Sequence, residues 1–310
     1  MKITDLEQRI RDFINSARRQ SSLLENTADW NKLCSSLDLI GDTQLAIESY
    51  PLLCKSEDDG ARYLIIYGIL QALLLQQDAA KHIAASLNIK VKLPKELEDI
   101  RIVRNSAAGH PGFQKENGQS KSCFISRSSL SPSGFDLMTV YSEGNDYKMD
   151  HVNIPKLLKI QETYLGEILS KVVDELEMQE TEHRKMHKGT KLIDCFPHTI
   201  RYFFGKLFEA TSGEDKYCLG AMHLELIQNC LDDFHNKLEV RGEWDVNESI
   251  KYHYEKLSYP MTLLELYFKD KTDSKLNDKD AYIFVSFLVE HIDALKKIAV
   301  EIDEEYAKAP

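Results

Sequence analysis

Residues 62–87, RYLIIYGILQALLLQQDAAKHIAASL, decide the fold class of this 310-residue chain. In the first half, from Leu64 to Leu75, apolar side chains would cover almost every side of a helix. A helix of that kind lies in the middle of a bundle or in the core of a dimer. The apolar run is about 13 residues long, short of the ~20 residues that cross a bilayer. We therefore expect a mainly α-helical bundle with this segment near its centre, and no membrane partner.

Most of the remaining sequence also has helical periodicity. Thr4 and Glu7 form a capping box, after which apolar residues recur at steps of three and four. The further helices expected are Trp30–Leu39, Gln44–Ser49 (ended near Pro51), Lys95–Ala108, Ile154–Glu180, Thr199–Ala210, Glu214–Val240, Val246–Leu257, Pro260–Lys269 and Asp278–Tyr306.

Residues 113–153 change character and interrupt the helices. Short apolar runs are separated by Ser131-Pro132-Ser133-Gly134 and by Glu143-Gly144-Asn145, which is typical of a small antiparallel hairpin or meander. A second interruption, the polar residues 181–191, indicates a hinge or domain boundary. We expect a first helical domain over residues 1–185, with the β insertion at about 113–153, and a C-terminal helical domain over 186–310.

The charge distribution disfavours a protein that coats nucleic acid. The net charge is −11, but the region from Arg101 to Arg127 holds five cations against one acid, Glu116. A local basic island in an acidic protein suits transient contact with a short RNA segment. Its members are Arg101, Arg104, Lys115, Lys121 and Arg127. We expect Arg104 to be a catalytic cation and the other four to bind RNA beside it.

The cysteines and histidines indicate neither disulfides nor a metal site. Six scattered cysteines without a CxxC pair, in a chain whose start is a charged amphipathic helix, lead us to expect reduced thiols and a cytoplasmic location. The spacing of His183, His187, Cys195 and His198 matches no zinc module that we can justify, and chance histidines in a solvated linker explain it better. No Walker loop, GxGxxG or GxSxG is present, so we expect no cofactor.

Residues 104–110, RNSAAGH, carry the most informative chemistry. They contain a fixed cation, a polar amide and an imidazole, with five residues between the Arg and the His. A guanidinium can bind a scissile phosphate bidentately, and an imidazole can move protons to or from a 2′-hydroxyl and a leaving 5′-oxygen. On a straight helix, positions six apart point about 120° away from each other. A bend at Gly109-His110-Pro111 would swing His110 back towards Arg104 and Asn105.

The run of residues 99–111, DIRIVRNSAAGHP, resembles the signature of the HEPN superfamily. That signature is an Arg, usually followed by Asn, Asp or His, and then a His after a gap of four to six residues. The match consists of Arg104, Asn105 and His110, and the apolar helix that precedes it looks like the one that packs beside the motif in such bundles. The resemblance covers roughly residues 1–180, and the strands inserted at 113–153 depart from the simplest family pattern.

The resemblance implies a dimerising helical bundle in which two motifs face one cleft. It also implies a metal-independent endoribonuclease of toxin, abortive-infection or other antiviral type, with an RNA substrate and an antitoxin or defence-system partner. Arg104 would stabilise the pentavalent phosphate, Asn105 would orient the His or the phosphate, and His110 would act as general base or acid. The choice between acid and base stays open, since a helix C-terminus favours the imidazolium and Arg104 opposes it.

A function of another class stays open as well. The acidity of the chain and the absence of the motif from the C-terminal half are also typical of a catalytically inactive helical module that binds a protein or senses a ligand. A third alternative is a latent enzyme whose trigger binds the C-terminal region.

Overall fold

Helices make up most of the chain, and a small antiparallel sheet is inserted among them. The computed structural model describes residues 2–116, 119–142, 147–212, 216–269 and 276–308. The mainly α-helical fold with an inserted antiparallel sheet is confirmed. The chain divides into two compact units, Met1–Glu177 (unit 1) and Met178–Pro310 (unit 2), so the division falls a few residues before the one expected at 185/186.

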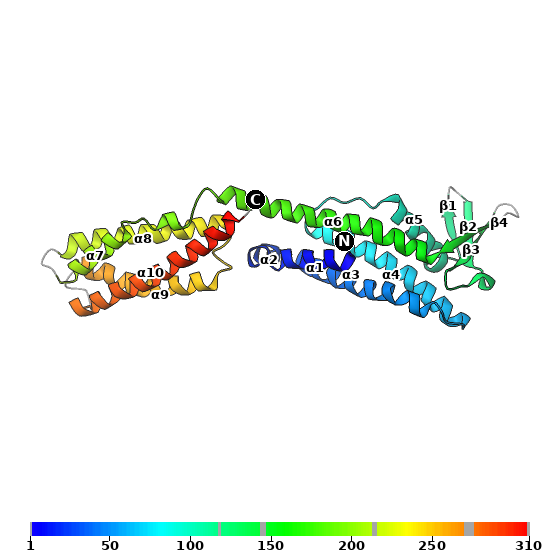
Figure 1. Cartoon of the computed structure of the whole chain (residues 1–310), viewed down its shortest axis with the longest axis horizontal. Helices are drawn as coiled ribbons and strands as arrows, with labels where there is room; N and C mark the ends of the chain where they lie inside the picture. Colours follow the sequence, from blue (N-terminus) through cyan, green and yellow to red (C-terminus); the bar gives the residue numbers. More distant parts are fainter. Residues whose placement is uncertain (1, 117–118, 143–146, 213–215, 270–275, 309–310) are drawn as a thin grey trace. The chain divides into compact units, whose positions relative to one another are not determined.

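Unit 1 is a helical bundle with the sheet at the end where α6 begins (Figure 1). Its helices are α1 (Ile3–Ile14), α2 (Ala17–Leu24), α3 (Thr27–Leu53), α4 (Asp59–Ser86), α5 (Lys95–Arg104) and the first part of α6 (Ile154–His187). Buried glutamines connect the three long helices. Gln161 of α6 shares hydrogen bonds with Gln76 and Gln77 of α4, and Gln76 donates to Gln44 of α3 at 3.1 Å. This network places α4 between α3 and α6.

Two prolines lie inside helices, and in each case two segments expected to be separate form one continuous helix. Pro51 lies in the last turn of α3, which is one continuous helix over the two segments expected to be separate. Proline removes one backbone hydrogen bond, and α3 ends two residues after it, near the place expected from the sequence. Pro260 lies within α9 (Glu248–Lys269), where its neighbours Leu257 and Leu264 are buried in the core. There the packing outweighs the lost hydrogen bond.

The central helix is only partly buried within one chain. Leu70 and Leu73 of α4 are fully buried, as expected. Leu64, by contrast, is 74% exposed, and Tyr67 one turn later is also exposed. The apolar character of α4 therefore exceeds what the core of unit 1 uses.

The sheet is the antiparallel meander expected from the sequence. Its strands are β1 (Gln114–Glu116), β2 (Gln119–Ile125), β3 (Gly134–Tyr141) and β4 (Tyr147–Asn153), in the order β1-β2-β3-β4. A short 3-10 turn, Arg127–Ser129, lies between β2 and β3. Phe135, Leu137 and Val152 point from one face of the sheet into a core shared with Ile69 and Leu70 of α4. The insertion is thus packed on the bundle.

The polar segment 181–191 does not interrupt α6 where a hinge was expected. The helix continues to His187, and a short 3-10 turn, Ile193–Cys195, follows it. The remaining helices of unit 2 are α7 (Ile200–Ala210), α8 (Lys216–Arg241), α9 and α10 (Asp278–Ala307). Apolar residues of α10 recur at steps of three and four and are buried against the other helices of this unit.

A buried arginine closes the C-terminal end of α6. Arg241 is 2% exposed and donates hydrogen bonds to the carbonyl oxygens of His187 and Thr190. Its charge is balanced by Asp303 at 3.2 Å, and Asp303 also accepts the backbone N–H groups of Leu192 and Ile193. Helix-terminal carbonyls need such donors, and this cation supplies them.

All six cysteines are free thiols. No helix in the described part of the chain is both long enough and apolar enough to cross a bilayer.

Candidate functional site

The RNSAAGH segment lies at the end of α5, where the helix widens. Residues Asn105–Gly109 form a π-helical turn, and His110 follows with non-helical dihedral angles of φ −138° and ψ 55°. Hydrogen bonds in a π-helix run between residues five apart, and such turns occur often at functional sites. The backbone N–H of His110 accordingly donates to the carbonyl oxygen of Asn105 at 2.8 Å. The expected bend is therefore a widened turn that ends at His110.

Arg104 is held by two neutral amides. Its Nε and Nη2 both donate to Oε1 of Gln71 on α4, at 3.1 and 2.6 Å, and its Nη1 donates to Oδ1 of Asn105 at 3.0 Å. A guanidinium has five N–H groups. Three of them donate to acceptors among the described residues, so two remain for a further acceptor. Because neither partner is a carboxylate, the positive charge of Arg104 is oriented without being neutralised.

Gly109 provides the space that this guanidinium occupies. A Cβ atom at position 109 would come within 2.5 Å of Nη1 of Arg104 and within 3.3 Å of Oδ1 of Asn105. The π turn therefore brings residues five apart together twice, as Arg104 with Gly109 and as Asn105 with His110. Any other side chain at 109 would displace the guanidinium.

Gln114, at the start of β1, fixes the turn from the outside. Its Nε2 donates to the carbonyl oxygens of both Asn105 and His110, each at 3.1 Å. The residues directly after His110 run along β2, since the N–H of Cys123 donates to the carbonyl oxygen of Pro111 at 2.7 Å. The inserted sheet thus supports the segment that carries the imidazole.

Asn105 and His110 are exposed, and Arg104 is half-buried. Among the described residues, no hydrogen bond joins the His110 ring to Arg104 or to any other side chain. The structure therefore brings Arg104 and Asn105 into direct contact and fixes the backbone of His110 beside them. Together they offer an uncompensated cation, an amide and a free imidazole on one short, accessible segment.

The other cations of the basic island are in different surroundings. Arg101 forms an ion pair with Asp78 at 2.8 Å, and Arg127 forms one with Asp59 at 2.9 Å. The Asp59 hydrogen bond raises the pKa of Arg127 further. Lys121 lies in β2, and Lys115 lies in β1, opposite Ser120, with a side chain outside the described ones. Two of the four expected RNA contacts are therefore already paired with acids.

Of the expected group, His183, His187 and Cys195 have partners within unit 2, and His198 is exposed. His183 and His187 lie with ring centroids 4.7 Å apart, and the Nε2 atom of His183 is 3.0 Å from the hydroxyl of Tyr306. Lys237 donates to Sγ of Cys195 at 3.3 Å, and burial raises the pKa of this thiol to about 11. Within the described residues, no three His, Cys, Asp or Glu side chains are grouped so as to hold a metal ion.

Gln71 and Gln114 are site residues that the sequence did not indicate. Gln71 is the first polar residue of the apolar run in α4, and a polar interruption there is the signal that could have pointed to it. Gln114 has no such signal, because its role depends on how β1 returns alongside the motif.

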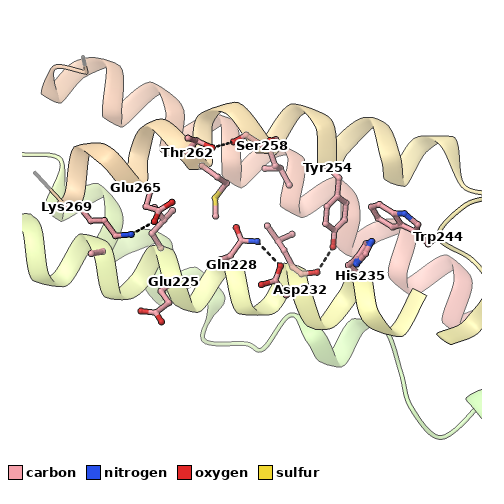
Figure 2. Close-up of a pocket in the computed structure, with 15 residues that line it drawn as sticks. Glu225, Gln228, Asp232, His235, Trp244, Tyr254, Ser258, Thr262, Glu265 and Lys269 are labelled. Carbon is pink, nitrogen blue, oxygen red and sulfur yellow. Dashed lines mark hydrogen bonds and ion pairs between the residues drawn. The ribbon is translucent and has the colours of Figure 1, made fainter. Parts of the chain in front are cut away.

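A sizeable cavity lies in unit 2, away from the motif residues in sequence. It is a groove of about 710 Å³ between α8 and α9 (Figure 2). Buried Leu224, Leu231 and Leu257 form its floor. Charged and polar side chains line its walls, among them Glu225, Asp232, His235, Glu265 and Lys269. A groove with an apolar floor and a few polar groups is the usual form of a ligand site.

Comparisons with protein-family models, with curated proteins and with solved structures return no match.

Proposed function

We propose that unit 1 is a metal-independent endoribonuclease of the HEPN type, acting at a composite site formed by two copies of the chain in antiviral defence or as a toxin. The observation that carries this proposal is the state of Arg104. Its guanidinium is oriented by Gln71 and Asn105, and neither residue is charged. An oriented, uncompensated guanidinium beside a free imidazole is suited to a phosphate that gains negative charge during the reaction.

The reaction needs two proton transfers. The 2′-oxygen loses its proton and attacks the phosphorus, the bond to the 5′-oxygen breaks, and that oxygen takes up a proton. The products are a 2′,3′-cyclic phosphate and a 5′-hydroxyl. His110 serves one of these transfers, and Arg104 stabilises the phosphorane between them. Because one imidazole cannot serve both oxygens at once, a second copy of the motif supplies the other group.

Exposed apolar residues on one face of α4 support the proposal that a second copy of the chain completes the site. Leu64, Tyr67 and Gln71 lie three or four residues apart, so they share one face of the helix. The first two are exposed, and the third binds Arg104. An apolar surface that leads directly to the catalytic cation suits a homodimer whose two motifs meet. Such a dimer would also bury the part of α4 that unit 1 leaves exposed.

The test is cleavage of RNA by the purified chain in the presence of EDTA. The wild type should produce fragments with 2′,3′-cyclic phosphate and 5′-hydroxyl ends, whereas Arg104→Ala and His110→Ala should not. Arg201→Ala and His198→Ala, at exposed positions of unit 2, are the matched controls and should cleave normally. Equal cleavage by either motif variant, or cleavage that requires added divalent metal, would refute the proposed mechanism.

Expression in bacterial cells tests the toxin role separately. The wild type should arrest growth, and the His110→Ala variant should not. Growth arrest by both forms would indicate that toxicity, where present, comes from something other than cleavage.

The groove of unit 2 favours a second function, the sensing of a ligand by the C-terminal region. Gln228→Trp would fill the groove from its rim, and Asn229→Trp places the same side chain at the neighbouring exposed position, which does not line it. If the groove senses a ligand, the first variant should change the growth phenotype of the wild type and the second should not. Equal phenotypes would exclude a sensing role for the groove.

A further inference from the structure

The sheet has an unusual outer face. An antiparallel sheet packed on a core by one face normally carries polar residues on the other. Here the buried face holds Phe135, Leu137 and Val152. The opposite face is also apolar, although it is open to solvent; its residues include Phe124, Met138, Val140, Tyr147 and Met149.

The strand register gathers these side chains into two rows. Phe124 of β2 pairs with Met138 of β3, which pairs with Met149 of β4. In the second row, Val140 pairs with Tyr147. Phe124 is 48% exposed and Tyr147 is 64% exposed. Such side chains on neighbouring strands form a continuous surface, because paired residues stand about 5 Å apart.

This surface continues into the catalytic segment. The backbone of Pro111 is hydrogen-bonded to Cys123 of β2, and the hydroxyl of Ser122 donates to the carbonyl oxygen of Gly112 at 2.8 Å. His110 therefore directly precedes the chain that lies along the β2 side of the sheet. Phe113, which is 63% exposed, lies between His110 and β1. The segment that follows His110 thus joins the motif to the edge of the sheet and carries an exposed ring of its own, Phe113.

Charge favours a polyanion over an ordinary protein partner. Residues 101–153, which hold the motif and the sheet, contain six Lys or Arg and five Asp or Glu. The rest of the chain contains 33 and 45 respectively. On the outer face itself, the carboxylate of Asp136 is paired with His151 at 2.7 Å. The part of the sequence that forms this surface therefore lacks the excess of negative charge that the rest of the chain carries.

We propose that the outer face of β2, β3 and β4 is a base-stacking surface that holds unpaired RNA and delivers its backbone to Arg104 and His110. This inference rests on the proposed ribonuclease function and identifies where its substrate binds. Aromatic rings on an open sheet stack on bases of any sequence, and a base can reach them only when it is unpaired. Phe124 and Tyr147 supply the rings, and the methionines fill the surface between them.

The test measures binding without cleavage. The probe is a short fluorescein-labelled 2′-O-methyl oligoadenosine, which lacks the 2′-hydroxyl needed for the reaction, and the readout is fluorescence anisotropy. The Phe124→Ala/Tyr147→Ala double variant should bind ~10-fold more weakly or worse, in line with the usual contribution of base stacking. Tyr147→Phe keeps the ring and should bind like the wild type. Tyr259→Ala, at a 66% exposed position of unit 2, is the matched control and should also bind normally. A blunt RNA duplex should bind more weakly than the single strand.

The outcomes separate this inference from the proposed function. A wild-type chain that binds the probe but never cleaves RNA would keep the stacking surface and refute the nuclease. Cleavage with an unchanged KM in the double variant would keep the nuclease and refute the stacking surface. Equal binding by wild type and double variant, no binding by either, or loss of self-association in the double variant with RNA binding intact would each overturn the inference.

Discussion

Gly109 lies against the guanidinium of Arg104, so closely that a Cβ atom at 109 would stand 2.5 Å from Nη1. The two residues are five apart, which is the spacing that a π-helical turn brings together. The position of the cation thus depends on a residue that has no side chain.

Gly109→Ala should separate activity from stability. The added methyl displaces the end of a flexible side chain, so the free energy of unfolding should change by less than ~1 kcal/mol. Cleavage should fall ~10-fold or more, since the guanidinium leaves Asn105 and the phosphate it would stabilise. Urea unfolding and RNA cleavage measure the two effects. Gly112→Ala, where a Cβ meets no atom within 4 Å, is the control and should leave both unchanged.

Gln71→Glu should abolish the proposed RNA cleavage while keeping the geometry of the site. The new carboxylate would accept the same two hydrogen bonds from Arg104 and would also neutralise its charge. We expect ~10-fold or greater loss of cleavage with no loss of thermal stability. Gln71→Ala, which removes the acceptor but keeps the charge, should retain more activity than Gln71→Glu. The reverse order would show that orientation matters more than free charge.

Leu64→Asp should dissociate the proposed dimer. Leu64 is 74% exposed in the single chain, so the charge should not unfold the monomer. Sedimentation velocity should show a shift to monomer, and cleavage should be lost with it. Val240→Asp introduces the same charge at a 74% exposed position of unit 2 and should keep the wild-type mass and activity. An unchanged mass for Leu64→Asp would remove this face of α4 from the interface.

The stability of unit 2 should fall in mild acid because of two facing histidines. The Nδ1 atoms of His253 on α9 and His291 on α10 are 2.7 Å apart. Burial lowers the pKa of His253, and the charge of His291 lowers it further, while Glu290 opposes both. The unfolded chain therefore takes up this proton first, so stability is full above about pH 6.5 and is lost as the pH falls through the folded pKa.

Each unit contains one tryptophan, Trp30 in unit 1 and Trp244 in unit 2, which allows this to be measured. In a Trp30→Phe background, the fluorescence of Trp244 reports urea unfolding of unit 2 alone. The midpoint should decrease between about pH 7.5 and pH 5, and His253→Gln should flatten the slope. A slope unchanged by that substitution would assign the acid sensitivity to other groups.

Arg241→Met should destabilise unit 2 strongly. The substitution leaves the nearly buried carboxylate of Asp303 without its cation and the carbonyl groups at the end of α6 without their donor. Breaking a buried ion pair from one side costs about 3–5 kcal/mol. The same Trp244 measurement should show this loss, and adding Asp303→Asn should recover part of it. Full stability of the single variant would contradict the role assigned to Arg241.

The sequence predicts the elements of this fold better than their connections. Helical periodicity and turn residues were sufficient for most of the helices and for the antiparallel strands β2, β3 and β4, but α2 and β1 were not expected. The same signals failed at the expected gap between Leu39 and Gln44, which α3 crosses, and at Pro260, where tertiary packing keeps α9 continuous. Periodicity is a property of a local segment, so it carries no information about tertiary packing.

In the candidate site, too, the sequence predicts the residues better than the contacts between them. Arg104, Asn105 and His110 could be selected from residue type and spacing alone. The partners that determine what each cation can do, Gln71 for Arg104 and Asp78 for Arg101, lie more than 20 residues away in sequence. The periodicity of the sequence also does not show whether a backbone hydrogen bond joins residues four apart or five apart. The sequence therefore predicted a bend here, without identifying it as a π-helical turn.

The π-helical turn also makes the site depend on the number of residues between Arg104 and His110. Substitutions between Asn105 and Gly109 change what the segment touches, but removing one residue would let the backbone close in ordinary α-helical fashion. The residue that meets the Arg104 guanidinium would then no longer be the fifth along the chain, and the space that Gly109 leaves for it would be lost. The number of residues in the turn, as well as their identity, therefore sets where the cation can lie. The five-residue spacing of the turn thus determines which groups lie next to each other at the site.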